Sequence, residues 1–310
     1  MPSKTELFGR WLQGSVVIAD EGVSTGRRFW VHSGTGTDGA GHGGSPDAPF
    51  ASIDYAIGKC TADKGDIIYV MPGHAESYGD GEGFTADIAA VRIIGIGWGA
   101  ARPTLTFAHA AASCAVSAAS VAIENIRFVA GITAVAAGVA LAATATDFEM
   151  RGCEFYWGGT TGDDFVLCVS MLAGADRAIF EGNRFLQEPA VAGNASAIKF
   201  VGPCDNMIIR GNEFMGDSSV ACVNGITAIS QGLMFLDNVV HNADAGEPYL
   251  EVFTGTTGVI ANTRGLASGA TIAANAVADA MAHCENFVVN TAGTYAIIGG
   301  AGGVPAVDAD

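Results

Sequence analysis

Beyond residue 90 the chain repeats a pattern of eight residues, and this repeat limits the possible folds more than any other feature. The last positions of successive units are 26 to 30 residues apart. The aligned units are Val91–Trp98, Val121–Phe128, Phe148–Phe155, Ala178–Phe185, Met207–Phe214 and Leu233–Val240. One unit is too short to bury an apolar face alone, so neighbouring units must stack on each other. The repeat therefore predicts a solenoid, which continues in a less clear register through Val259–Asn262 and Cys284–Phe287.

The pattern within each unit indicates β-structure. The first, third and last positions are apolar, with the period of two that a strand requires, and the fifth is usually glycine or another turn-forming residue. An α-helical repeat would have a period of about 3.6 residues and fewer glycines. Stacking at about 4.8 Å would complete the backbone hydrogen bonds between coils. We therefore expect an all-β, right-handed parallel β-helix with a short N-terminal cap helix.

The same alignment predicts two stacks along the solenoid. Aromatic residues at the last position would point inward and pile up: Phe128, Phe155, Phe185 and Phe214. Asparagine recurs at the sixth position, where a corner is expected, and would form a side-chain ladder: Asn183, Asn212 and Asn238.

The chain is expected to form one β-helix domain, residues 29–310, behind an N-terminal arm of residues 1–28 whose composition departs from the repeat. The domain would comprise a cap over about 29–66, coils over about 67–290 and a tail over about 291–310. Residues 49–57 are predicted to include a short amphipathic helix, which Ser52 or the preceding turn could cap. His74 is expected to be a solvated turn residue.

The composition excludes several classes of protein. Only 15% of the residues are charged, 49% are hydrophobic and 43 are glycine, which suits short strands joined by tight turns. A net charge of −17 with 15 Lys and Arg argues against nucleic acid as a partner. No apolar run is long enough to span a membrane, and no signal peptide is visible.

No metal site is predicted. The seven cysteines form no CxxC pair and no zinc-like cluster with histidine, so we expect reduced thiols packed as small apolar residues. The glycine-rich loop of residues 33–46 lacks the lysine of a phosphate-binding loop. Calcium is the one cofactor that the acidic composition leaves open.

Three features together resemble the pectate-lyase-like β-helix proteins, in the form common among bacteriophage virion proteins. The features are the entry Phe29-Trp30-Val31 with the later Ser45-Pro46-Asp47-Ala48-Pro49-Phe50, the segment Gly65-Asp66-Ile67-Ile68-Tyr69-Val70-Met71-Pro72-Gly73, and coils that read Gly-Asn-x-Phe. They cover most of residues 29–290. The resemblance is specific for the fold and weak for function, because this fold carries lyases, hydrolases, tailspikes and inert structural proteins.

Charged residues recur at two positions of the aligned units. The fourth position carries Glu124, Arg151, Glu181 and Arg210, and the seventh carries Arg127, Glu154, Arg184 and Glu213. Each row alternates in sign from coil to coil, and the two rows are opposite in sign within each coil. We interpret them as two ion-pair ladders on an outer face. The alternative, a catalytic surface, is disfavoured because flanking arginines lower the pKa of a carboxyl group.

The best local candidate for a glycan site is the segment from Tyr156 to Asp164. The rings of Tyr156 and Trp157 could stack on a sugar, and the adjacent acids Asp163 and Asp164 would be the catalytic pair of an enzyme. The simpler interpretation, which we favour, is a loop between coils with its acids in water.

The sequence-based hypothesis is a non-enzymatic structural protein of a phage particle, a capsid decoration or fibre component. We expect a homotrimer that is made in the host cytoplasm and contacts other virion proteins through residues 1–28. The alternatives are a polysaccharide depolymerase or lyase, and a carbohydrate-binding module with glycan as its partner.

Overall fold

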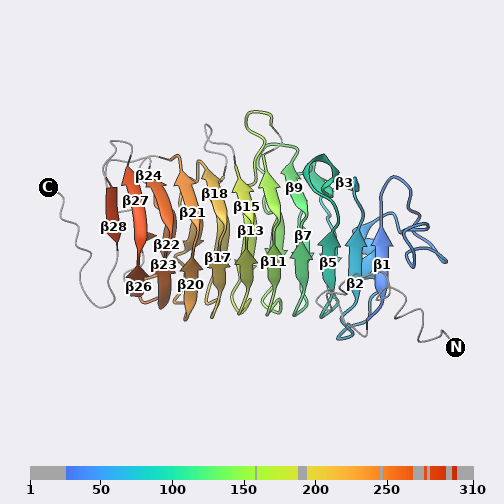
Figure 1. The fold of residues 1–310 in the computed structure, drawn as a ribbon, viewed down its shortest axis with the longest axis horizontal. Helices are drawn as coiled ribbons and strands as arrows, with labels where there is room; N and C mark the ends of the chain where they lie inside the picture. The colour runs from blue at the N-terminus through green and yellow to red at the C-terminus, as the bar shows by residue number, and fades with distance from the viewer. Residues whose placement is uncertain are drawn as a thin grey trace, which may run out of the picture.

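The chain folds into three sheets whose strands lie side by side along one long axis (Figure 1). The computed structural model describes residues 26–157, 159–187, 194–244, 247–267, 276–277, 280–290 and 295–298. Sheet A contains β1 (Arg28–Val31), β2 (Ile67–Val70), β5 (Arg92–Gly95), β8 (Ala122–Glu124), β11 (Glu149–Arg151), β14 (Ile179–Glu181), β17 (Ile208–Arg210), β20 (Leu233–Leu236), β23 (Gly258–Ala261) and β26 (Met281–Cys284). Sheet B contains β3 (Ala75–Tyr78), β6 (Thr104–Phe107), β9 (Arg127–Ala130), β12 (Glu154–Tyr156), β15 (Arg184–Leu186), β18 (Glu213–Gly216), β21 (Val239–Asn242), β24 (Arg264–Ala267), β27 (Asn286–Asn290) and β28 (Tyr295–Ile298). Sheet C contains β4 (Thr85–Ala86), β7 (Cys114–Val116), β10 (Val139–Leu141), β13 (Leu167–Leu172), β16 (Ser196–Val201), β19 (Val223–Gly225), β22 (Leu250–Val252) and β25 (Ala276–Val277).

The order of the strands makes the chain a parallel β-helix, as the repeat predicts. From β2 onward the chain visits sheets A, B and C in turn and then returns to sheet A one coil further along. Strand pairs between coils are parallel throughout the described strands, except that β28 runs antiparallel to β27. In the described part of the chain, no helix is long and apolar enough to cross a membrane.

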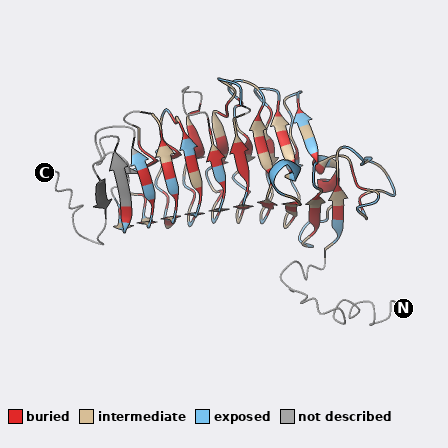
Figure 2. Cartoon of the chain, turned by 45° about the horizontal axis from the view of Figure 1, so that its top comes forward, coloured by how far each residue is buried: buried red, intermediate tan, exposed pale blue. Residues whose placement is uncertain are grey.

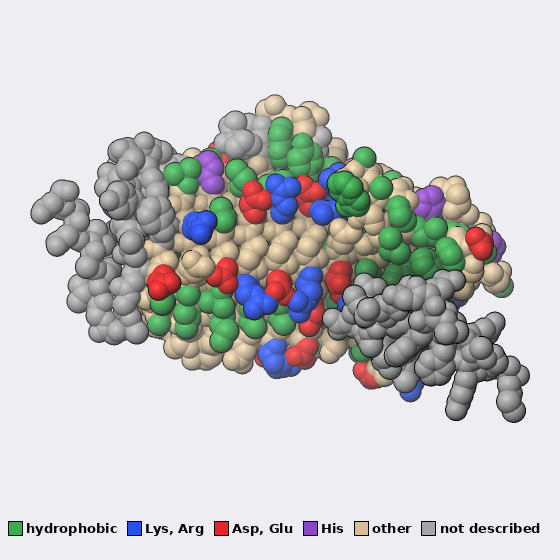
Figure 3. Space-filling view, viewed as in Figure 1, with side chains coloured by type: hydrophobic (Ala, Val, Ile, Leu, Met, Phe, Trp, Pro, Cys, Tyr) green, Lys and Arg blue, Asp and Glu red, His purple; other side chains and the backbone are tan. Residues whose placement is uncertain are grey.

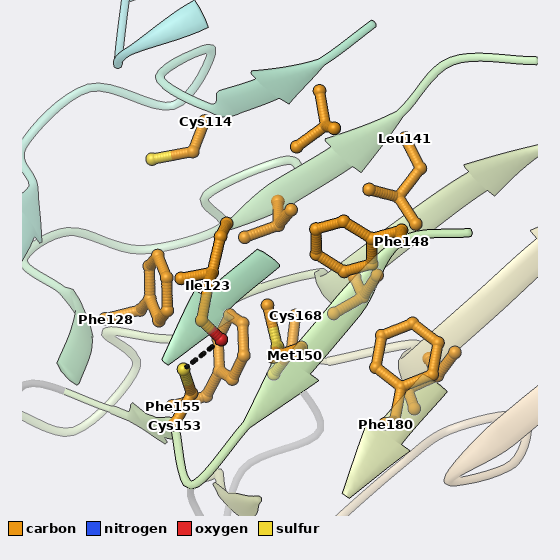
Figure 4. Close-up of a cluster of buried hydrophobic side chains, with 14 of the residues drawn as sticks. Cys114, Ile123, Phe128, Leu141, Phe148, Met150, Cys153, Phe155, Cys168 and Phe180 are labelled. Carbon is orange, nitrogen blue, oxygen red and sulfur yellow. Dashed lines mark hydrogen bonds between the residues drawn. The ribbon is translucent and has the colours of Figure 1, made fainter. Parts of the chain in front are cut away.

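Aromatic side chains from consecutive coils stack inside the solenoid, and buried residues line its interior (Figure 2). The ring centroids of Phe128 and Phe155 are 4.7 Å apart, those of Phe155 and Phe185 are 5.2 Å apart, and those of Phe185 and Phe214 are 4.8 Å apart. All four side chains are at most 1% exposed. Phe148 and Phe180 form a second ring contact between coils, with their centroids 6.0 Å apart (Figure 4). Offset ring stacking therefore joins each coil to the next along the core.

Trp98 departs from the expected inward position. The alignment placed it level with Phe128, but its side chain is 85% exposed, and Leu105 of β6 is the residue that pairs with Phe128. A 3₁₀ turn at Gly99–Ala101 precedes β6 and lengthens this corner. The alignment is thus correct for the sheet A strand of this coil and wrong for its last position.

An asparagine ladder lies at the corner between sheets A and B. The Oδ1 atoms of Asn183, Asn212 and Asn238 accept hydrogen bonds at 2.9 Å from the backbone N–H groups of Cys153, Asn183 and Asn212. Their Nδ2 atoms donate at 2.9 Å to the carbonyls of Met150, Phe180 and Ile209. All three side chains are buried, so the ladder satisfies backbone groups that the turn would otherwise leave without partners.

The N-terminal part of the solenoid contains one helix, α2 (Ile53–Ile57), within the range predicted for it. The Ser52 hydroxyl oxygen accepts a hydrogen bond from the N–H of Tyr55 and also donates to Asp38. The helix contacts β1, β2 and β4. Residues 1–25 of the predicted arm, and all of the predicted tail except β28, lie outside the described residues.

His74 is not a solvated turn residue as expected, because its side chain is 1% exposed. Its Nδ1 atom accepts from the N–H of Ser33, and its Nε2 atom lies 2.9 Å from Glu76 Oε1 without the alignment of a hydrogen bond. Glu76 also accepts from the N–H of Ile53 and from the Tyr78 hydroxyl. This cluster ties the glycine-rich loop and the start of α2 to sheet B.

Candidate functional site

The first charged row runs along the outer face of sheet A. Arg151 pairs in register with Glu124 on one side and Glu181 on the other, and Arg210 follows Glu181. The Glu181 carboxylate forms ion pairs with both Arg151 and Arg210. Glu124 instead pairs with Arg92 at 2.6 Å, and Arg151 also contacts Glu149 at 3.1 Å. The row is therefore a network in which each carboxylate has an arginine partner.

The second charged row lies on sheet B, and Glu154 is its centre. Three arginines surround the Glu154 carboxylate: Arg102 at 3.2 Å, Arg127 at 2.9 Å and Arg184 at 3.6 Å. Arg184 also binds Glu213 at 2.7 Å. Because Glu154 is the shared partner of these arginines, removal of its charge would leave three guanidinium groups close together. Its residue is only 6% exposed, so water would screen their repulsion poorly. Both rows stabilise the contacts between coils, and neither contains a carboxylate free of arginine.

Tyr156 and Trp157 lie where β12 ends and the chain turns toward sheet C. Their ring centroids are 6.0 Å apart with planes tilted by 33°, and both side chains are half-buried. The turn at Gly159 comes close to the Tyr156 hydroxyl, since a Cβ atom at Gly159 would lie 3.9 Å from it. The backbone N–H of Trp157 donates to Leu186, which keeps this position in the stack. Two partly exposed rings are thus held next to each other at one edge of sheet B.

Asp163 and Asp164 do not form a pair of solvated acids. Asp163 is half-buried, but Asp164 is 1% exposed, and its carboxylate accepts from the N–H of Phe165 at 2.8 Å and from Asn194 Nδ2 at 3.4 Å. The expectation that both acids face water is therefore wrong for Asp164. Its hydrogen bonds fix the base of the loop that carries Trp157.

Sequence reasoning missed two acids at this end of the coils. Burial and the nearby Asp244 carboxylate raise the pKa of Asp217, and burial and Glu247 raise the pKa of Glu251. Asp217 immediately follows β18, at the same edge of sheet B as Trp157 and two coils further along. At about 4.8 Å per coil this is about 10 Å along the axis. The stacking of coils is what brings Asp217 and Asp244 together, and no motif in the sequence marks them.

The connections from sheet B to sheet C vary in length. There are 15 positions from Glu154 to Val169, but only 10 from Glu213 to Val223, although these residues are equivalent in the stacked coils. A yellow-green loop rises above the strands between β9 and β15 in Figure 1. We call this region the loop edge, defined as residues 156–157, 159–166, 217–222 and 243–244. A rigid scaffold with loops of variable length is the usual support of a binding site.

A metal site does not emerge from this geometry. Among the described residues, no group of three or more His, Cys, Asp or Glu side chains is arranged to hold a metal ion.

Comparison with known proteins yields likenesses of shape only. No protein-family model matches the sequence, and no curated protein matches it significantly. Solved structures that resemble the chain include a rhamnogalacturonan lyase (10% identity, TM-score 0.45, 79% of this chain and 75% of that one). They also include the GH136 lacto-N-biosidase from Eubacterium ramulus (10% identity, TM-score 0.39, covering 92% of this chain and 70% of that one). A third is the A-module of the Azotobacter vinelandii mannuronan C-5 epimerase AlgE6 (12% identity, TM-score 0.28, covering 74% of this chain and 75% of that one). All three are at most 12% identical to this chain and have TM-scores below 0.5, so the strand pairing of the chain itself is what makes it a parallel β-helix.

Proposed function

We propose that the protein binds polysaccharide along the loop edge. The observation that carries this proposal is the pair of partly exposed rings of Tyr156 and Trp157. They lie at the start of the connection from Glu154 to Val169, the longer of the two connections between sheets B and C compared above. Aromatic faces supply a flat apolar surface with a polar tip, which suits the C–H face of a sugar ring and its hydroxyl groups. Successive coils repeat at about 4.8 Å, so side chains at this edge lie in a line that a linear polymer can follow.

Asp217 is the residue through which binding could extend to cleavage. Glycoside hydrolysis requires a carboxyl group that donates a proton, and both burial and a neighbouring carboxylate raise a carboxyl pKa in the direction that favours this role. Asp217 has both influences, the second from Asp244. It replaces the Asp163 and Asp164 pair as the candidate acid, because Asp164 is committed to Phe165 and Asn194.

Affinity electrophoresis in gels that contain neutral or acidic polysaccharides tests the binding proposal. We expect retardation that Trp157→Ala and Tyr156→Ala reduce by an order of magnitude or more. Trp98→Ala is the matched control, because Trp98 is a highly exposed tryptophan at a different corner. No retardation in any gel, or an equal loss with Trp98→Ala, would contradict the proposal. Release of reducing ends, or new absorbance from unsaturated uronate, that Asp217→Asn abolishes would show cleavage as well.

A second candidate function is a non-enzymatic structural protein of a phage particle, either a capsid decoration or a fibre component. It is favoured by the use of the ladder carboxylates, among them Glu154 and Glu181, in ion pairs that join coils into a stiff rod. In this proposal the N-terminal residues attach the rod to other virion proteins. Arg28 already pairs with Ile67 in sheet A, so the test is deletion of residues 1–25 only. We expect unchanged β-rich circular dichroism and reduced incorporation into particles, whereas unaltered incorporation would refute it.

A further inference from the structure

The corner between sheets A and B presents two charged rows with almost no side chains between them. Gly152, Gly182 and Gly211 occupy the turn with φ of +58°, +63° and +62°, and all three are exposed. A Cβ atom built at any of them would meet nothing within 4 Å. We call these residues the glycine strip. Figure 3 shows a band of uncharged surface between two lines of charged side chains.

The signs of the two rows form a pattern that is complementary to itself. Along sheet A the signs alternate from Glu124 to Arg210, and at each coil the sheet B residue has the opposite sign to the sheet A residue. The sheet A residues in order are Glu124, Arg151, Glu181 and Arg210, and their sheet B counterparts are Arg127, Glu154, Arg184 and Glu213. If a second copy is turned about an axis parallel to the solenoid, its sheet B row faces the first copy's sheet A row at the same height. Every charge then faces an opposite charge, because both copies share one spacing between coils.

In two of the coils, apolar side chains border the charges on their outer sides and match in the same arrangement, whereas the coil of Arg151 has Glu149 and Tyr156 at these positions. Ile179 and Ile208 are partly exposed on sheet A, two positions before Glu181 and Arg210. Leu186 is partly exposed and Met215 is 41% exposed on sheet B, two positions after Arg184 and Glu213. Turning a second copy as above brings Ile179 level with Leu186, and Ile208 level with Met215. Exposed apolar side chains next to complementary charges are typical of a protein interface.

We propose that copies of this chain associate in parallel, with the sheet A row of one copy against the sheet B row of the next and the glycine strip near the rotation axis. The absence of side chains on the strip allows the corners to approach closely. Repetition of this contact around a closed ring gives a cyclic homo-oligomer, and the homotrimer stays the expected form. Tyr156 of the loop edge lies in register with Leu186 and Met215, so this contact borders the proposed glycan surface. The charge pattern that carries the inference does not depend on glycan binding.

The test uses reversal of one row, which separates this contact from its alternatives. In the row A variant, six residues exchange sign so that pairs within the chain are kept: Arg92→Glu, Glu124→Arg, Glu149→Arg, Arg151→Glu, Glu181→Arg and Arg210→Glu. Three acids and three bases are exchanged, so the net charge stays at −17. Alternation within the row is preserved, but like charges now face each other between parallel copies. Reversing the sheet B row in addition, at positions 102, 127, 154, 184 and 213, restores the complementary pattern.

Light scattering coupled to size-exclusion chromatography gives the mass of each form. We expect an oligomer for the unaltered protein, a β-rich monomer for the row A variant and an oligomer again when both rows are reversed. In an antiparallel contact, the sheet A row of one copy would face the sheet A row of the other in the opposite direction. Reversal of that row in both copies would keep opposite charges face to face, so an oligomeric row A variant would overturn the proposal.

A monomeric unaltered protein would overturn it too. Should the row A variant fail to fold, association of the unaltered protein must weaken from low to high salt, because screening acts on exposed charges. Salt-independent association would also contradict the proposal.

Discussion

Asn212→Ala tests the asparagine ladder at its centre. The Asn212 side chain accepts from the buried N–H of Asn183 and donates to the carbonyl of Phe180. Alanine removes both bonds at a site that is 1% exposed. Asn183 Nδ2 keeps its bond to Met150, Asn238 Oδ1 keeps the N–H of residue 212, and Phe180 stays in the paired register of β14 and β17, so the N–H of Asn183 is the group left without a partner. At about 1–3 kcal/mol for a buried unsatisfied group, the loss of stability should be about 1–3 kcal/mol.

Urea unfolding followed by far-ultraviolet circular dichroism measures this loss. The control is Asn262→Gly, at an exposed position of the same corner where φ is +49°, a conformation that glycine adopts without strain. The side-chain hydrogen bond that it removes, from Asn262 Nδ2 to Asp237 Oδ1, is exposed to solvent. We expect the control to change stability by less than about 0.5 kcal/mol, as is usual for surface substitutions. A loss below about 1 kcal/mol for Asn212→Ala would mean that water or a rearranged turn replaces the side chain, and that the ladder is not a main source of stability.

Three further predictions concern the core, the cysteines and acid stability. Phe185→Ala should destabilise the solenoid by about 3–5 kcal/mol in the same unfolding assay, because it leaves a cavity between two stacked rings. Burial raises the pKa of the Cys153 and Cys222 thiols to about 12, so a thiol reagent at pH 8 should react rapidly only with exposed Cys284, and Cys284→Ser should remove that fast phase. Hydrogen bonds from Arg177 lower the pKa of Asp147. Their stabilisation is present above the ordinary carboxyl pKa and is lost as pH falls through the lowered value, so the difference in melting temperature between the protein and Arg177→Gln should shrink from pH 7 to pH 3.

The fold could be predicted because the backbone of one corner is the same in coil after coil. A residue in the left-handed conformation favours glycine or asparagine, as at Gly182 and Gly211, and the next position favours an asparagine that can bond to the neighbouring coil. Both requirements leave a mark in the sequence at a fixed place. Trp98 shows where this signal ends, since its coil lacks the Gly-Asn pair and an inserted 3₁₀ turn displaces the following strand.

The candidate site was predicted only in part, because its residues do not repeat from coil to coil. Tyr156 and Trp157 are neighbours in sequence, so their proximity could be read directly. The raised pKa of Asp217 depends on burial and on Asp244, which is 27 residues away and becomes a neighbour only through stacking. Similarly, Asn194, which donates a hydrogen bond to the Asp164 carboxylate, belongs to the next coil. Sequence patterns reveal side chains that repeat with the coil, whereas a site on the variable connections has no such periodicity.

The corner between sheets A and B also determines where the chain can change its length. Exactly the same number of residues, two, separates the sheet A strand from the sheet B strand in three successive coils: Gly152-Cys153, Gly182-Asn183 and Gly211-Asn212. An insertion there would shift the asparagine out of the ladder and turn the charged residues of the following strand toward the core. The connections between sheets B and C carry no such constraint, and their differences in length leave the registers of sheets A and B undisturbed. New segments can therefore be acquired at the loop edge while the rest of the solenoid keeps its structure, so the proposed binding surface can vary without loss of the scaffold.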